Sequence, residues 1–244
     1  MRFYLATALM GPLFLLQGRH VRRVTPRLPE ADGPREGEAG EGPGLSLLIA
    51  GDSAAAGVGV ALQAQALSGQ LVQALSPSHR LRWKLLARSG DRAAQLLQSL
   101  QEAPAASFDT ALVSIGVNDV TALTGLRSWA VSLQRIVQTL RQKFGVRQVY
   151  LSSLPPMHLF PALPQPLRWW LGVRAKQCNQ VLAAVAGAEP DCVFVHIPYP
   201  QQGQPQPGEM IASDGFHPGA PAYTLWAEHV AGLLQQGRGP QIDG

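Results

Sequence analysis

The sequence predicts an α/β fold in which a parallel sheet lies between two layers of helices. Short apolar runs that end at glycine, proline or polar residues alternate along the chain with stretches whose apolar residues recur at helical spacing. Consecutive parallel strands need a crossover connection, usually a helix, and the crossovers cover both faces of the sheet. We therefore expect a three-layer α/β/α sandwich around a central, roughly five-stranded parallel sheet. A length of 244 residues, with 46% apolar and 15% charged residues, suits one such domain.

The expected strands are short and mostly apolar, as strands buried on both faces are. The run from Leu45 to Ala50 ends at Gly51, and the run from Val149 to Leu154 ends at Pro155. Glycine and proline at these points favour a turn out of the sheet. Strands are expected at residues 45–50, 81–87, 111–115, 149–154 and 193–197.

The expected helices lie between these strands. In residues 129–144, Leu133, Ile136 and Leu140 fall on one helical face, and Gly145 follows in the C-cap position. The same spacing predicts helices at residues 60–75, 93–100, 129–144, 167–186 and 222–234.

The N-terminal segment, residues 1–28, contains an uncharged apolar run from Phe3 to Leu16, followed by the basic residues Arg19, Arg22 and Arg23. The run has 14 residues, whereas an untilted membrane span needs about 20. Three interpretations remain open: a helix anchored at a membrane surface, an atypical signal peptide without an A-x-A cleavage site, or a helix packed on the protein itself.

These interpretations predict different locations for the protein. The anchor interpretation predicts association with a membrane surface through residues 3–23. The anchor and packed-helix interpretations favour a membrane-associated or cytoplasmic protein, and the signal-peptide interpretation would mean export.

Residues 29–44 are rich in glycine, proline and glutamate, so we expect a tether or surface loop there. The folded domain is expected at residues 45–236 and a C-terminal tail at 237–244. The net charge of +4 is mild, and the chain has no zinc-finger spacing, RNP-like aromatic motif or lysine-rich helix, so we expect no nucleic-acid partner.

Residues that could take part in catalysis follow the ends of the expected strands. Ser53 follows the first strand, Gly90 the second, Asn118 the third, and Asp214 and His217 come after the fifth. In parallel α/β sheets, ligands bind outside the carboxyl ends of the strands. The sequence therefore predicts a single site at this edge of the sheet.

The residue types at this edge suit nucleophilic acyl transfer. A serine hydroxyl such as that of Ser53 needs a base to take its proton, and the base is usually a histidine oriented by a carboxylate. Asp214 and His217 lie three positions apart, and Gly215 between them allows the tight turn on which they can meet. The backbone N–H groups of Ser53 and Gly90 and the side-chain amide of Asn118 are candidate donors to a developing oxyanion.

Four short motifs, in this order along residues 45–234, resemble the conserved blocks of the SGNH hydrolases, the superfamily of GDSL-type esterases and lipases. The matching segments are Gly51-Asp52-Ser53, Ser89-Gly90, Gly116-Val117-Asn118-Asp119 and Asp214-Gly215-Phe216-His217. One departure is an alanine in place of the leucine that follows the serine in the family's name.

The resemblance implies a flavodoxin-like fold and a serine hydrolase of carboxylic esters. It implies Ser53 as nucleophile, His217 as general base, Asp214 as the residue that orients it, and Ser53, Gly90 and Asn118 as the oxyanion hole. It implies neither a metal nor an organic cofactor. The rival G-x-S-x-G motif of α/β-hydrolases does not fit, because Ala55 occupies its last glycine position.

The apolar, proline-rich segment 155–164 follows the fourth strand and suggests a lid or acyl-binding wall. Phe160 and, just beyond the segment, Trp169 are the expected substrate contacts. Such a wall favours acyl lipids such as lysophospholipids as substrates. The alternatives are an O-acetyl esterase acting on carbohydrate or cell wall, and a non-catalytic binding domain on the same fold.

Overall fold

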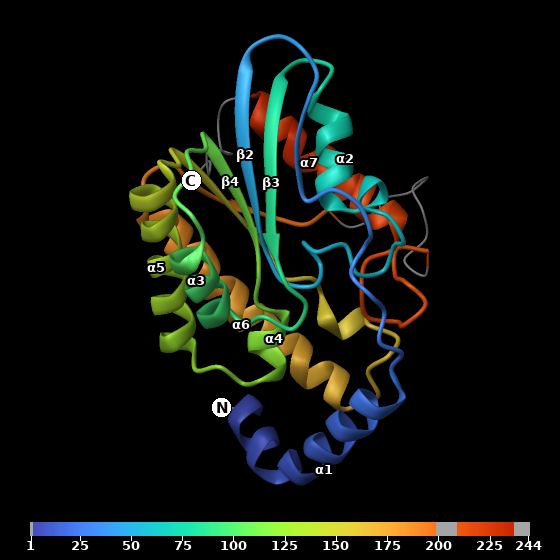
Figure 1. Ribbon diagram of the computed structural model, residues 1–244. Coiled ribbons are helices and arrows are strands. Elements are labelled where there is room, and N and C mark those ends of the chain that lie inside the picture. The colour runs from blue at the N-terminus through green and yellow to red at the C-terminus, as the bar shows by residue number, and fades with distance from the viewer. Residues whose placement is uncertain (1, 199–208, 237–244) are drawn as a thin grey trace.

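The computed structural model describes residues 2–198 and 209–236 (Figure 1). The expected C-terminal tail, residues 237–244, lies outside the described part of the chain.

The central sheet has six strands in the order β1-β3-β2-β4-β5-β6. Five of them run parallel, and β1 pairs with β3 in the antiparallel direction at one edge. The predicted α/β/α class is therefore confirmed, with one more strand than expected. The strands are β1 (Glu36–Ala39), β2 (Gly44–Gly51), β3 (Arg80–Ala87), β4 (Thr110–Ser114), β5 (Gln148–Ser152) and β6 (Cys192–Val195).

The additional strand corrects the expectation for residues 29–44. Part of that segment forms β1, and Ala31 before it is buried, with its N–H donating to the carbonyl of Ala56. An edge strand is held by backbone hydrogen bonds on one side and needs no apolar face of its own. Its polar, glycine-containing sequence therefore carries no strand signal.

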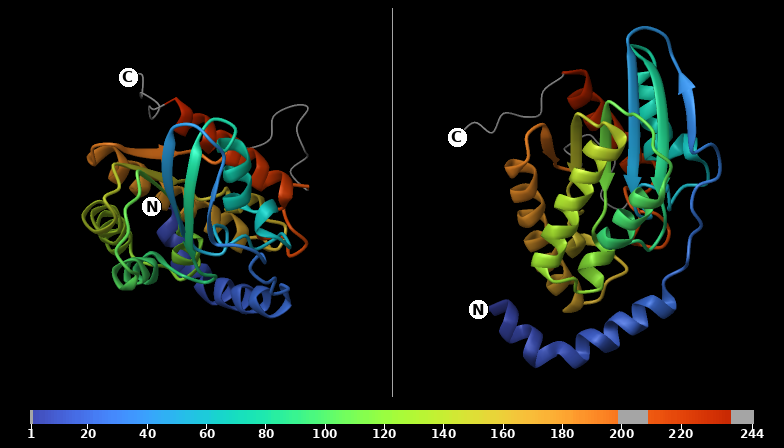
Figure 2. Two further views of the ribbon diagram at one scale, coloured as in Figure 1. Left: turned by 45° about the horizontal axis from the view of Figure 1, so that its top comes forward. Right: turned by 60° about the vertical axis from the view of Figure 1, so that its left-hand side comes forward.

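Helices cover both faces of the sheet (Figures 1 and 2). Helices α2 and α7 share one apolar cluster with the sheet, and α3, α5 and α6 share the other. The short helix α4 was not expected. The helices of the domain are α2 (Leu67–Leu75), α3 (Ala93–Glu102), α4 (Val117–Thr121), α5 (Leu126–Phe144), α6 (Leu167–Ala188) and α7 (Ala220–Gln235), with short 3₁₀ turns η1 (Gln63–Gln65) and η2 (Met157–Leu159).

Helix α1 (Arg2–Val24) lies across the carboxyl-end side of the sheet and contacts α6 (Figure 2). The rings of Phe14 and Trp170 stack with their centroids 4.8 Å apart. The side chain of Gln17 accepts a hydrogen bond from Leu167 N–H and donates one to the carbonyl of Gln165. These contacts match the packed-helix interpretation. Within residues 2–198 and 209–236, no helix has both the length and the apolar character needed to cross a membrane.

Gly51, the last residue of β2, is expected to tolerate no larger side chain. A Cβ atom at this position would overlap the carbonyl oxygen of Ser114 on the neighbouring strand and lie 2.8 Å from the Cβ of Ala55. Overpacking of this kind costs about 1–3 kcal/mol, so Gly51→Ala should lower the free energy of unfolding, measured by urea denaturation, by at least that amount. Gly187→Ala is the matched control: Gly187 lies in α6 with open space around it, and removing a helical glycine should stabilise by about 1 kcal/mol. An unchanged midpoint for Gly51→Ala would contradict this account.

Candidate active site

Ser53 lies in the turn that leaves β2 at the carboxyl edge of the sheet. The turn is fixed by backbone hydrogen bonds, from Asp52 N–H to the carbonyl of Ser114 and from Val58 N–H to the carbonyl of Ser53. The buried Asp52 carboxylate accepts the N–H of Ala54 at 3.1 Å. This hydrogen bond helps to hold the turn that carries Ser53.

The side chains of Ser53, His217 and Asp214 form one hydrogen-bonded chain. His217 Nε2 lies 3.0 Å from the Oγ of Ser53, and Nδ1 lies 2.6 Å from Oδ2 of Asp214. The other carboxylate oxygen, Oδ1, accepts the backbone N–H groups of Phe216 and His217 at 2.9 and 3.0 Å. Gly215 has a φ of 68° within this turn, a left-handed conformation that glycine adopts without strain. The turn therefore fixes the imidazole ring against the serine hydroxyl.

The environment of Asp214 keeps its carboxylate ionised. Burial of the side chain raises its pKa, but hydrogen bonds from the His217 ring and from the two backbone N–H groups outweigh that effect, and the net pKa is lowered. An ionised Asp214 stabilises a proton on Nδ1 of His217 and leaves Nε2 as the acceptor facing Ser53.

Asp52 behaves in the opposite way. Its complete burial raises the pKa of the carboxyl to about 7, although the N–H groups of Ala54 and Gly116 favour the charged form. The hydrogen bonds described for the Asp52 carboxyl come from backbone N–H groups, whereas those of the His217 ring go to Asp214 and Ser53, so we assign Asp52 to the shape of the turn and not to proton transfer.

The expected oxyanion donors converge on the same space. Ser53, Gly90, Asn118 and His217 all line one cavity. The side-chain amide of Asn118 donates to the carbonyl of Asp91 at 3.0 Å. An amide nitrogen carries two N–H groups, so one remains for a ligand. Gly90 has a φ of 86° and open space where a Cβ would lie, which leaves its backbone accessible.

Two carboxylates hold the loop that carries Gly90. Asp119 accepts the N–H of Ala93 at 2.9 Å. Glu30 accepts the N–H of Ser89 at 2.6 Å and pairs with Arg35 at 2.8 Å. Sequence reasoning missed Glu30, because it lies in the segment interpreted as a tether.

Two cavities meet at Ser53 and His217. The smaller, of about 110 Å³, is lined by apolar residues after β4, β5 and β6 and includes Phe160. The larger, of about 820 Å³, extends to α1 and includes Trp170. The structure thus brings Phe160 to the site, where its ring packs against that of Phe216 with the ring centroids 4.9 Å apart.

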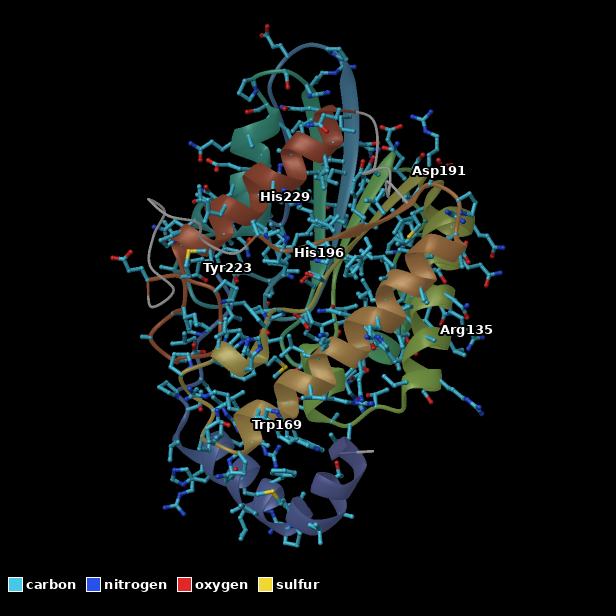
Figure 3. The ribbon with its side chains drawn as sticks, turned by 180° about the vertical axis from the view of Figure 1, so that it is seen from behind. Arg135, Trp169, Asp191, His196, Tyr223 and His229 are labelled. Carbon is cyan, nitrogen blue, oxygen red and sulfur yellow. The ribbon has the colours of Figure 1, made fainter. Side chains whose placement is uncertain are left out.

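The expectation for Trp169 is corrected by the structure. Trp169 lies on the part of α6 beside α1, is 43% exposed, and is absent from the described lining of both cavities (Figure 3). Its neighbour Trp170 faces the larger cavity instead. Successive residues on a helix point about 100° apart, so Trp169 and Trp170 point in different directions.

In the described part of the chain, no group of three or more His, Cys, Asp or Glu side chains is placed to hold a metal ion. The arrangement of residues at the site can perform proton transfer between a hydroxyl and an imidazole beside a set of N–H donors.

Residues 49–225 match the GDSL-like lipase/acylhydrolase family. A GDSL-like esterase of Mycobacterium tuberculosis is 30% identical over 263 residues, which cover 97% of this chain and 81% of the relative.

Solved structures share the fold. The crystal structure of TesA has a TM-score of 0.58 at 24% identity, over 78% of this chain and 98% of TesA. The acetylxylan esterase Axe2 of Geobacillus stearothermophilus has a TM-score of 0.55 at 18% identity, over 81% of this chain and 96% of the enzyme. The chain belongs to the GDSL-like lipase/acylhydrolase family and is an ester hydrolase of the SGNH type.

Proposed function

We propose that the protein hydrolyses carboxylic esters through an acyl-enzyme intermediate on Ser53. The observation that carries this proposal is the chain Ser53–His217–Asp214, with distances of 3.0 and 2.6 Å, at a cavity that Gly90 and Asn118 also line. A weak nucleophile, its base and the group that orients the base are thus in hydrogen-bond contact.

In the first step, His217 Nε2 takes the proton of the Ser53 hydroxyl as Oγ attacks the ester carbonyl carbon. The negative charge that develops on the carbonyl oxygen is stabilised by the N–H groups of Ser53, Gly90 and Asn118. The imidazolium then gives its proton to the leaving alcohol. In the second step His217 activates a water molecule, which releases the carboxylic acid and regenerates Ser53.

We propose acyl lipids, with lysophospholipids as the leading case, as the substrate class. The cavity walls beside Ser53 are largely apolar, with Phe14, Leu167 and Trp170 in the larger cavity and Phe160 in the smaller. Apolar walls stabilise hydrocarbon chains by burial, whereas a sugar needs several polar partners.

An O-acetyl esterase acting on carbohydrate or cell wall is the second candidate. The observation that favours it is the smaller cavity, whose volume of about 110 Å³ would suit an acetyl group. A non-catalytic binding domain is the least favoured function, because the hydrogen-bonded chain from Asp214 to Ser53 is intact.

A fluorophosphonate probe tests the nucleophile directly. We expect covalent labelling of the wild-type protein and of Ser99→Ala, a serine substitution on α3 away from the site, and none of Ser53→Ala. A mass shift on the peptide that contains Ser53 would support the acyl-enzyme mechanism. Labelling of the Ser53→Ala variant, or no labelling of the wild-type protein, would exclude Ser53 as the nucleophile.

We also propose that α1 associates with an anionic lipid surface. Leu9, Leu13 and Leu16 are 81%, 40% and 63% exposed, and the exposed Arg19 and Arg23 follow them on the same helix. Exposed leucines beside arginines suit the boundary of a membrane with anionic headgroups.

Vesicle co-sedimentation checks this association. The wild-type protein should sediment with phosphatidylglycerol vesicles more than with phosphatidylcholine vesicles, and the triple variant Leu9→Ser/Leu13→Ser/Leu16→Ser should lose most of that binding. Val131→Ser, which changes an exposed apolar residue on α5, is the control. Equal binding by the wild-type and triple-variant proteins would show that α1 is not the contact.

A further inference from the structure

One face of α1 lines the cavity that contains Ser53. The residues on this face are spaced alternately four and three positions apart, the spacing of a single helical stripe. They are Thr7, Gly11, Phe14, Gly18 and Val21, and Leu15 and Arg22 of α1 also line the cavity. The stripe belongs to the N-terminal segment, outside the region 49–225 that matches the family.

The opposite wall of this cavity comes from α6 and the loop before it. Leu163, Leu167, Trp170 and Leu171 line it, and Trp170 stacks on Phe14 of α1. Trp170 Nε1 donates to the Oγ1 of Thr7 at 2.8 Å, which links the two helices a second time. The cavity is therefore a largely apolar space between α1 and α6 that begins at Ser53.

We propose that the acyl chain of the ester substrate binds between α1 and α6, so that α1 is part of the substrate site. This inference rests on the proposed function. The cavity volume is about 820 Å³, whereas the three heavy atoms of an acetyl group need roughly 100 Å³ at about 30 Å³ for each water-sized group. The space therefore suits a medium or long hydrocarbon chain.

The position of the oxyanion donors favours the acyl chain over the alcohol as the occupant. Gly90 and Asn118 line this larger cavity and are absent from the lining described for the smaller one. The carbonyl group that they would bind belongs to the acyl part of the ester, and its chain extends from the same carbon. His217, which passes the proton to the leaving alcohol, lines both cavities.

Two glycines on the cavity-lining stripe make the inference testable. A Cβ at Gly11 would have no atom within 4 Å, and a Cβ at Gly18 would meet only the Arg22 guanidinium at 3.9 Å. Leucine at either position would thus extend into the cavity without meeting the backbone, and leucine is a better helix former than glycine. Both variants should fold as well as the wild-type protein.

The experiment compares kcat/KM for p-nitrophenyl decanoate and p-nitrophenyl acetate. We expect the ratio of decanoate to acetate activity to fall at least tenfold in Gly18→Leu and in Gly11→Leu. Gly187→Leu is the matched control, because it makes the same substitution at a helical glycine with open space outside the cavity. Its activity ratio should equal that of the wild-type protein.

A second ester series separates the acyl chain from the alcohol. Decyl acetate carries the long chain on the alcohol side, so its hydrolysis relative to p-nitrophenyl acetate should change less than tenfold in Gly18→Leu. A loss for decyl acetate without a loss for p-nitrophenyl decanoate would overturn the assignment to the acyl chain. Unchanged ratios in both glycine variants, with normal melting temperatures, would overturn the role of α1. Neither result would affect the proposed acyl-enzyme mechanism, which the fluorophosphonate labelling of Ser53 tests separately.

Discussion

His217→Ala is expected to lower kcat for ester hydrolysis by about 10⁴-fold or more, because an unassisted serine hydroxyl is a poor nucleophile. The imidazole is the group within hydrogen-bond distance of the Ser53 hydroxyl, at 3.0 Å, that can take its proton. Steady-state kinetics with a soluble p-nitrophenyl ester measures the effect. The melting temperature should change little, since the His217 side chain is 22% exposed.

His158→Ala is the control for this substitution. His158 is an exposed histidine of η2 and does not line either cavity in the described part of the chain. Its removal should leave kcat within twofold of the wild-type value. If His217→Ala retained a tenth or more of the wild-type kcat, another group would have to serve as the base.

Asn118→Ala is expected to lower kcat by about 10²- to 10³-fold, corresponding to roughly 3–4 kcal/mol of transition-state stabilisation. The side-chain amide is one of three proposed N–H donors, and its donation is strongest when the carbonyl oxygen carries negative charge. KM should therefore change much less than kcat, a split that a general loosening of the site would not produce.

Two controls separate this effect from a structural one. Asn118 Nδ2 also donates to the carbonyl of Asp91, so the melting temperature of Asn118→Ala should be measured with its kinetics. Gln138→Ala removes an exposed amide from α5 and should leave kcat unchanged. A loss in Asn118→Ala that appeared in KM alone would assign the amide to substrate binding and not to the transition state.

The parallel sheet could be predicted from the sequence because its signals are local. A strand buried on both faces has to be apolar and has to turn at its end, and β2 ends at Gly51 as expected. The helix predicted at residues 129–144 corresponds to α5, Leu126–Phe144, because one side of it packs on the core and repeats at helical spacing. The edge at which Ser53, Asn118 and His217 gather follows from the alternation of strands and helices.

The sequence by itself thus determined the class of fold, the edge of the sheet that carries the site, and the family. Only the tertiary structure decided the features that the local sequence pattern does not encode, namely strand β1 and the packing of α1. Strand β1 is held by backbone hydrogen bonds to β3, which its side chains do not encode. The apolar run of α1 did not reveal which element packs against it, because periodicity defines the buried face of a helix but not what covers that face. Only the packing of α1 on α6 placed Phe14 and Trp170, rather than Trp169, beside the cavity of Ser53.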